Sequence, residues 1–128
     1  FIHGHFSESD LYQVGNQVVM LSNLYWSWRQ PLYDAIFGYH WFMYHLNTVD
    51  GITPNEVEQQ RTIWLSEIEA LPQAQGIEGK RFLNLALLER AAAGLNLDGL
   101  SSDPKKPISD YLMEATRDHI RKLLEKLD

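Results

Sequence analysis

The stretch FGYHWFMYH, residues 37–45, most constrains the fold because it places seven rings in nine positions. Read as a helix, it carries two stripes of large side chains. One stripe contains Leu32, Ile36, Tyr39, Met43 and Leu46, and the other, about 100° round the helix, contains Tyr33, Phe37, His40 and Tyr44. Two stripes require two neighbouring elements, so we predict a central, aromatic-rich helix. Asp34, Gly38, Trp41 and His45 fall on the remaining side, where we expect solvent and where Trp41 is a misfit.

The start of the chain fits two interpretations. Leu11, Val14, Val18, Leu21 and Tyr25 recur at helical spacing, which predicts a helix over 8–28. Gly15 and the adjacent Val18 and Val19 weaken that helix and favour a strand as the second interpretation.

Start and stop signals define the remaining helices. Pro31 suits the first turn of the central helix, over 31–46, and Thr53, Pro54 and Glu56 form a capping box that opens the next one, ending before Pro72. A helix over 80–93, apolar around much of its circumference, is predicted to be buried and to stop at Gly94. The last helix begins near residue 107, after an expected loop over 95–106. We therefore predict an all-α, single-domain bundle of about five helices.

Length and composition fit one domain over 1–128, because 128 residues at 45% hydrophobic can bury an ordinary core. The chain begins at Phe1 instead of Met, so we expect a trimmed chain or a piece of a longer protein. Its lack of cysteine excludes disulfides, thiolate metal sites and thiol nucleophiles. A cysteine-free chain also fits a reducing compartment, so we predict a cytoplasmic protein. No apolar run is long enough to cross a membrane.

Charge argues against nucleic-acid binding. The net charge is −6, and residues 1–79 carry nine Asp and Glu against two Lys and Arg. Binding phosphate backbones needs clustered basic residues, which this half of the chain lacks. The later basic residues alternate with acidic ones, as on a solvated helix face. We therefore predict no nucleic-acid partner.

The ring cluster has three interpretations. The rings can form the core of the bundle, with hydroxyl and imidazole groups hydrogen-bonded inside. They can form an interface, because Trp and Tyr are enriched where proteins bind one another. They can also line a pocket for a small apolar or cationic ligand.

Our leading functional hypothesis is a small acidic protein-binding module, such as an inhibitor, an antitoxin-like partner, an adaptor or an oligomer subunit. Its partner would be another protein or a second copy of itself. The alternative is a helical domain that binds a small apolar or cationic ligand, with a catalytic role for His40 or Tyr44. The predicted binding residues are Trp26, Trp28, Arg29, Tyr33, Asp34, Phe37, His40, Trp41 and Tyr44.

Motifs for catalysis, metals and cofactors are missing from the sequence. There is no glycine-rich phosphate loop and no serine nucleophile elbow. His40 and His45 are five residues apart, which does not place two ligands on one helix face. His119 reads as a core or boundary residue that would titrate near neutral pH if partly buried. Asp110, Glu114 and Asp118 read as an ion-paired surface with Arg117 and Arg121. We therefore predict no metal, no cofactor and no assigned catalytic residue, which disfavours an enzyme.

Overall fold

The computed structural model describes residues 10–20, 28–97 and 107–127. Within these ranges the chain is mostly helical, with four α-helices, two short 3₁₀ turns and one β-hairpin. In chain order the elements are β1 (Leu11–Val14), β2 (Gln17–Met20), α1 (Tyr33–His45), η2 (Leu46–Thr48), α2 (Pro54–Ala70), η3 (Pro72–Ala74), α3 (Gly76–Leu97) and α4 (Pro107–Glu125).

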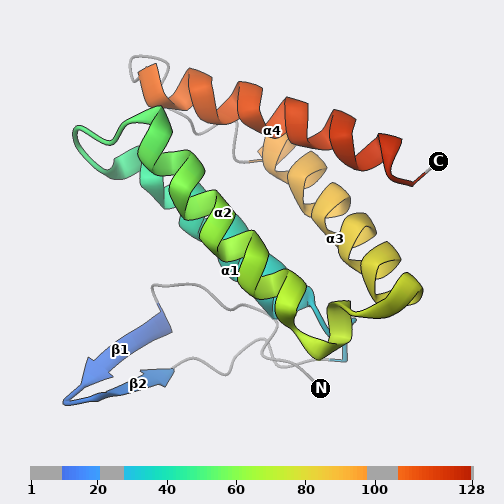
Figure 1. Cartoon of the computed structure of the whole chain (residues 1–128). Helices are drawn as coiled ribbons and strands as arrows, with labels where there is room; N and C mark the ends of the chain where they lie inside the picture. The colour runs from blue at the N-terminus through green and yellow to red at the C-terminus, as the bar shows by residue number, and fades with distance from the viewer. Residues whose placement is uncertain (1–9, 21–27, 98–106, 128) are drawn as a thin grey trace.

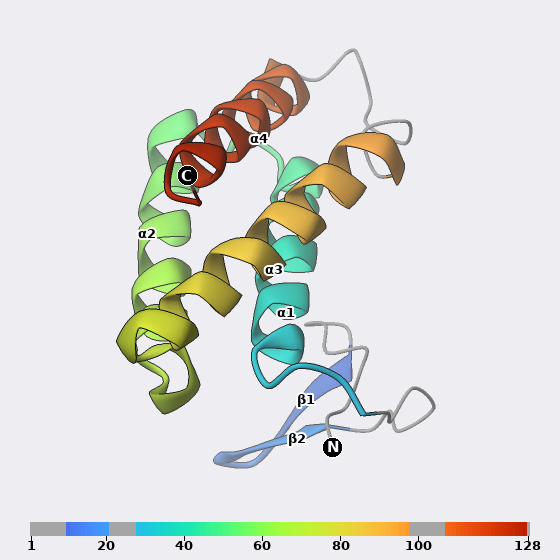
Figure 2. The same ribbon diagram turned by 90° about the vertical axis from the view of Figure 1, so that its right-hand side faces the viewer.

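The four helices form two layers of two helices each. α1 and α2 lie side by side, and α3 and α4 cross the same side of this pair (Figures 1 and 2). The hairpin lies at the end of the molecule where α1 begins. The core is built from α1, α2, α3 and α4 together, and its most deeply buried side chains are Leu32, Leu123 and Val57.

The predicted first helix is wrong at residues 11–20, which form an antiparallel hairpin. Leu11 faces Met20 and Val14 faces Gln17, so the connection is the two-residue turn Gly15–Asn16. Gly15 has φ +60° while Asn16 does not adopt a positive φ, as in a type II′ turn. The strand interpretation was therefore the correct one here. The apolar spacing matched a helix only by coincidence, because a two-residue glycine turn and β-branched residues favour a hairpin.

The first stripe predicted for α1 is confirmed as core. Its five members, Leu32, Ile36, Tyr39, Met43 and Leu46, are all buried. In the second stripe Phe37 is buried and the others are half-buried. The expectation of solvent on the third side is wrong, since Gly38 is buried and Asp34, Trp41 and His45 are half-buried. α1 is thus covered on every side, and Trp41 is no misfit.

The capping box of α2 is confirmed. The Thr53 hydroxyl accepts a hydrogen bond from the Glu56 backbone N–H at 3.3 Å, and the Glu56 carboxylate accepts one from the Thr53 backbone N–H at 2.8 Å. Pro54 occupies the first turn, where its missing N–H costs nothing.

The bounds predicted for α3 need correction at both ends. The helix begins at Gly76 and continues through Gly94 to Leu97, so Gly94 is not its stop. Residues 95–97 of the predicted loop are helical, and residues 98–106 lie outside the described ranges. Leu83, Leu87 and Ala91 face the core, whereas Phe82 and Leu85 are exposed. The prediction that α3 is buried around its circumference therefore holds for one face only.

Candidate functional site

A ladder of rings runs along α1. Tyr33 stacks on Phe37 with centroids 5.7 Å apart, Phe37 lies 6.0 Å from Trp41, and Trp41 meets Tyr44 edge to face at 5.5 Å. The Arg29 guanidinium sits 4.5 Å from the Tyr33 ring centroid, a cation–π contact that fixes the start of the ladder. The spacing of three or four residues in a helix therefore does bring the predicted rings together.

The predicted binding residues differ widely in exposure. Trp28 is 83% exposed and Arg29 is also exposed. Phe37 is buried, and Tyr33, Asp34, His40, Trp41 and Tyr44 are half-buried. Trp26 lies outside the described residues. The side chains with most surface to offer a partner are therefore those that precede α1.

A groove beside the start of the ladder contains residues that the sequence analysis did not select. Arg29, Gln30 and Tyr33 form one wall, and α3 supplies Phe82, Leu85, Ala86 and Glu89. The groove encloses about 360 Å³. The signal for Phe82 and Leu85 was present, because α3 carries more apolar positions than one core face can use.

The hairpin presents apolar side chains to solvent from both of its faces. Tyr12 and Val14 point to one face and Val18 and Met20 to the other, as the register requires, and they are 50%, 62%, 71% and 40% exposed. Residues 11–20 contain no charged side chain. A two-stranded hairpin is marginally stable by itself, and uncharged strands are the ones that pair with other chains.

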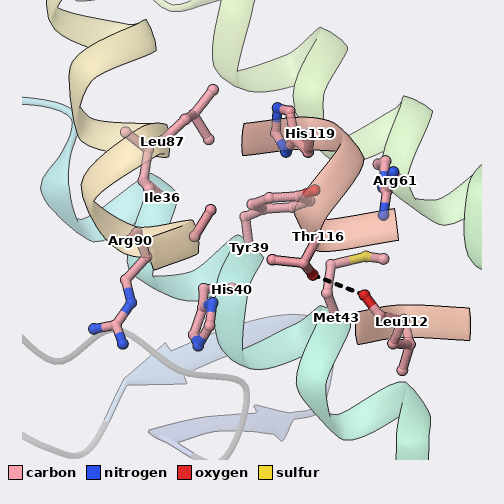
Figure 3. Close-up of a pocket in the computed structure, with 11 residues that line it drawn as sticks. Ile36, Tyr39, His40, Met43, Arg61, Leu87, Arg90, Leu112, Thr116 and His119 are labelled. Carbon is pink, nitrogen blue, oxygen red and sulfur yellow. Dashed lines mark hydrogen bonds between the residues drawn. The ribbon is translucent and has the colours of Figure 1, made fainter. Parts of the chain in front are cut away.

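A second, polar site lies inside the helical part (Figure 3). A cavity of about 50 Å³ is bordered by residues from all four helices. Its polar lining consists of Tyr39, His40, Arg61, Arg90, Thr116 and His119. Ile36, Met43, Leu87, Ala91 and Leu112 supply the apolar walls. Of the predicted binding residues, this cavity includes His40.

Arg61 is the central charged group of this site. Its side chain is 17% exposed and its Nη1 lies 3.4 Å from Glu58 Oε1. Its buried Nε has no hydrogen-bond partner within the described part of the chain. Glu58 is shared, since the same oxygen accepts a hydrogen bond of 2.6 Å from the Tyr111 hydroxyl. The sequence analysis missed Arg61. The available signal was an arginine four residues after Val57 on the apolar stripe of α2.

Burial and charge shift the titration of two groups around Arg61. Burial, followed by the charges of Arg61, Lys126 and Lys122, lowers the pKa of His119 to about 4, and Glu58 partly opposes this shift. The earlier expectation that His119 titrates near neutral pH is therefore wrong. Burial raises the pKa of Tyr39 above its usual value, and the hydrogen-bonded Arg61 guanidinium partly opposes that shift. Both side chains are neutral at pH 7.

His119 predicts a loss of stability in mild acid. Its folded pKa of about 4 lies below the ordinary value of 6.5, so between these values the unfolded chain binds a proton that the folded chain does not. The contribution is complete above about pH 6.5 and is lost as the pH falls toward 4. Allowing for partial solvent screening, we expect a loss of about 1 kcal/mol between roughly pH 7.5 and pH 5.

Urea unfolding of the wild type and of His119→Gln at both pH values measures this loss. Glutamine cannot titrate, so the pH-dependent difference between the two proteins isolates His119. An equal loss in both proteins would assign the acid sensitivity to other groups.

The acidic face of α4 behaves as an ordinary helix surface. Arg117 pairs with Glu114 at 3.1 Å, and Arg121 pairs with Asp118, so the predicted ion pairs are confirmed. Among the described residues no group of three or more His, Cys, Asp or Glu side chains could hold a metal ion. In the same ranges no helix is both long and apolar enough to span a membrane.

Comparison with known proteins identified no relative of this chain. No protein family, no curated protein and no solved structure matches this chain.

Proposed function

We propose that this chain is a protein-binding module whose partner is a second copy of itself. The observation that carries the proposal is the hairpin, which exposes Tyr12, Val14, Val18 and Met20 on two faces and has no charged residue. Exposed apolar area of this kind is typical of surfaces that another chain covers. Nothing else in the described residues combines strand edges with so much exposed apolar surface in so few positions.

Net charge limits the places where a second copy can bind. Each copy carries a net charge of −6, so two copies repel one another over most of their surfaces. The uncharged hairpin is a place where they can meet without that repulsion. A two-fold axis would place the same strand of each copy side by side, which is the self-complementary contact that most homodimers use.

The interface needs more area than the hairpin supplies. Stable interfaces bury roughly 800 Å² per partner, which exceeds what ten hairpin residues offer. We therefore include Trp28 and the groove formed by Arg29, Tyr33, Phe82 and Leu85, since the hairpin lies at the same end of the molecule as the start of α1 (Figure 2). Asp34, Phe37, Trp41 and Tyr44 would support this surface from behind, through the ring ladder that positions Tyr33.

A lysine at Val18 tests the proposal. We expect the wild type to be a dimer that dissociates on dilution, and Val18→Lys to raise the dissociation constant at least about tenfold, because it places a charge in the contact. Light scattering across a dilution series measures both constants. Ile63→Lys is the matched control, since Ile63 is an exposed apolar residue of α2, outside the proposed surface.

Two results would contradict self-association. One is a wild type that stays monomeric at every concentration up to about 1 mM, a dissociation constant weaker than the range of specific interfaces. The other is an equal weakening by Val18→Lys and Ile63→Lys, which would indicate a general charge effect.

The alternative function, a small apolar or cationic ligand among the rings, stays a prediction. The cavity that His40 borders does not favour a cation, because Arg61 and Arg90 border it as well.

A further inference from the structure

The polar side chains that line the cavity of Figure 3 are either cationic or neutral. Arg61 and Arg90 are permanently charged, and Tyr39, His40 and His119 add hydroxyl and imidazole groups. Among the described residues, no aspartate or glutamate borders the cavity. This is unusual in a chain whose first 79 residues contain only two basic side chains, Arg29 and Arg61. One of those two, Arg61, is half-buried at the cavity.

The half-buried Arg61 guanidinium has one buried donor, Nε, that finds no acceptor among the described residues. Its other donors are engaged: Nη1 lies 3.4 Å from Glu58 Oε1, which also accepts the Tyr111 hydroxyl, and the guanidinium is hydrogen-bonded to Tyr39. Glu58 borders the outer cleft that Arg61 and His119 also line, and not the cavity itself. A buried charge with part of its donor set unused is costly unless another acceptor completes it. An anion inside the cavity would provide that acceptor.

The other polar side chains of the cavity differ in whether they can donate a hydrogen bond to an anion. The Thr116 hydroxyl donates to the Leu112 carbonyl at 2.8 Å, so its proton is already used within α4. In Figure 3 Tyr39 lies between Arg61 and His40, with His119 beside it, so donors from three helices converge on one space. The phenol O–H of Tyr39 and one N–H of the neutral His119 imidazole can donate to an anion.

Size selects the class of anion. One water needs roughly 10–15 Å³ of such a cavity, so about 50 Å³ holds a few waters or one tetrahedral oxyanion. A nucleotide or a sugar is too large. Arginine is the side chain best suited to phosphoryl oxygens, because its fork can donate two parallel hydrogen bonds.

We propose that the cavity bordered by α1, α2, α3 and α4 binds a phosphate-like oxyanion, with Arg61 as its main ligand and Tyr39 and His119 around it. Arg90 contributes charge at the edge of the cavity, because its guanidinium lies over the Phe37 ring, 5.7 Å from the ring centroid. The anion is either free inorganic phosphate or the phosphoryl group of a small molecule whose remainder lies in the outer cleft of about 500 Å³. This site is separate from the hairpin surface, so either proposal can fail without the other.

Titration calorimetry with inorganic phosphate at constant ionic strength tests the site. We expect saturable binding by the wild type, at least a tenfold loss in Arg61→Met, and no change in Arg121→Met, a substitution on the exposed face of α4. If Arg61→Met does not fold, Tyr39→Phe replaces it and should also weaken binding, because it removes the phenol O–H that borders the cavity. Heat that never saturates, or an equal loss in Arg121→Met, would overturn the proposal.

A second readout locates the anion. Histidine NMR titration of the wild type in phosphate and in chloride should show the pKa of His119 rising in phosphate, because a bound negative charge favours the imidazolium. An unchanged His119 would place the anion elsewhere and refute the site. Competition by phenyl phosphate separates the sources: displacement assigns a phosphoryl group on a larger molecule, and failure to displace assigns the free ion.

Discussion

Replacing Leu123 by alanine is expected to lower the free energy of unfolding by about 3 kcal/mol, within the range of about 2–5 kcal/mol for buried leucines. Leu123 is 1% exposed and belongs to the cluster that joins α4 to the other helices. Removing its side chain loses apolar burial and leaves a cavity that the surrounding helices fill only in part. Urea unfolding followed by circular dichroism measures the difference.

Leu124→Ala is the matched control for this experiment. Leu124 is the next residue of α4, with the same side chain and the same helix propensity, but it is 49% exposed. We expect it to cost less than about 1 kcal/mol. Comparable losses in the two variants would mean that α4 does not dock on the face we describe.

Gly94→Ala is expected to destabilise the protein by about 2 kcal/mol, although alanine is the better helix former. A Cβ at this position would meet Cε1 of the His40 ring, with Nδ1 at 3.3 Å and Nε2 at 3.4 Å. The glycine lets α3 approach α1 closely, next to the cavity that His40 borders. Overpacking such a contact typically costs about 1–3 kcal/mol.

A double-mutant cycle with His40 tests whether the His40 ring causes this loss. In the His40→Ala background the obstacle is gone, so Gly94→Ala should stabilise the helix by up to about 1 kcal/mol through its propensity. Thermal or urea unfolding of the four proteins supplies the cycle. A similar loss from Gly94→Ala in both backgrounds would show that the His40 ring is not what requires the glycine.

Local signals predicted the elements whose stability is local. The capping box of Thr53 and Glu56 needs only residues three apart, so the start of α2 followed directly from the sequence. The stripe from Leu32 to Leu46 was equally direct, because an apolar repeat of this length has one orientation that buries it.

Sequence patterns whose meaning depends on neighbouring segments of the fold were misleading. The spacing of Leu11, Val14 and Val18 suits a helix as well as a hairpin, and only the Gly15–Asn16 turn separates the two. Gly94 resembles a helix stop, yet it is a contact point, because its role is set by the His40 ring on a helix about fifty residues away in the chain.

The sequence by itself determined that this chain is mostly helical, that α1 carries the rings, and that cysteine chemistry is excluded. Only the tertiary structure decided which charged and polar side chains border the same cavity. Arg61, Arg90 and His119 lie on three helices, and their convergence on one cavity depends on how α2, α3 and α4 cross α1. Helical periodicity fixes which face of a helix a residue occupies, whereas the packing of one helix on another fixes what that face meets.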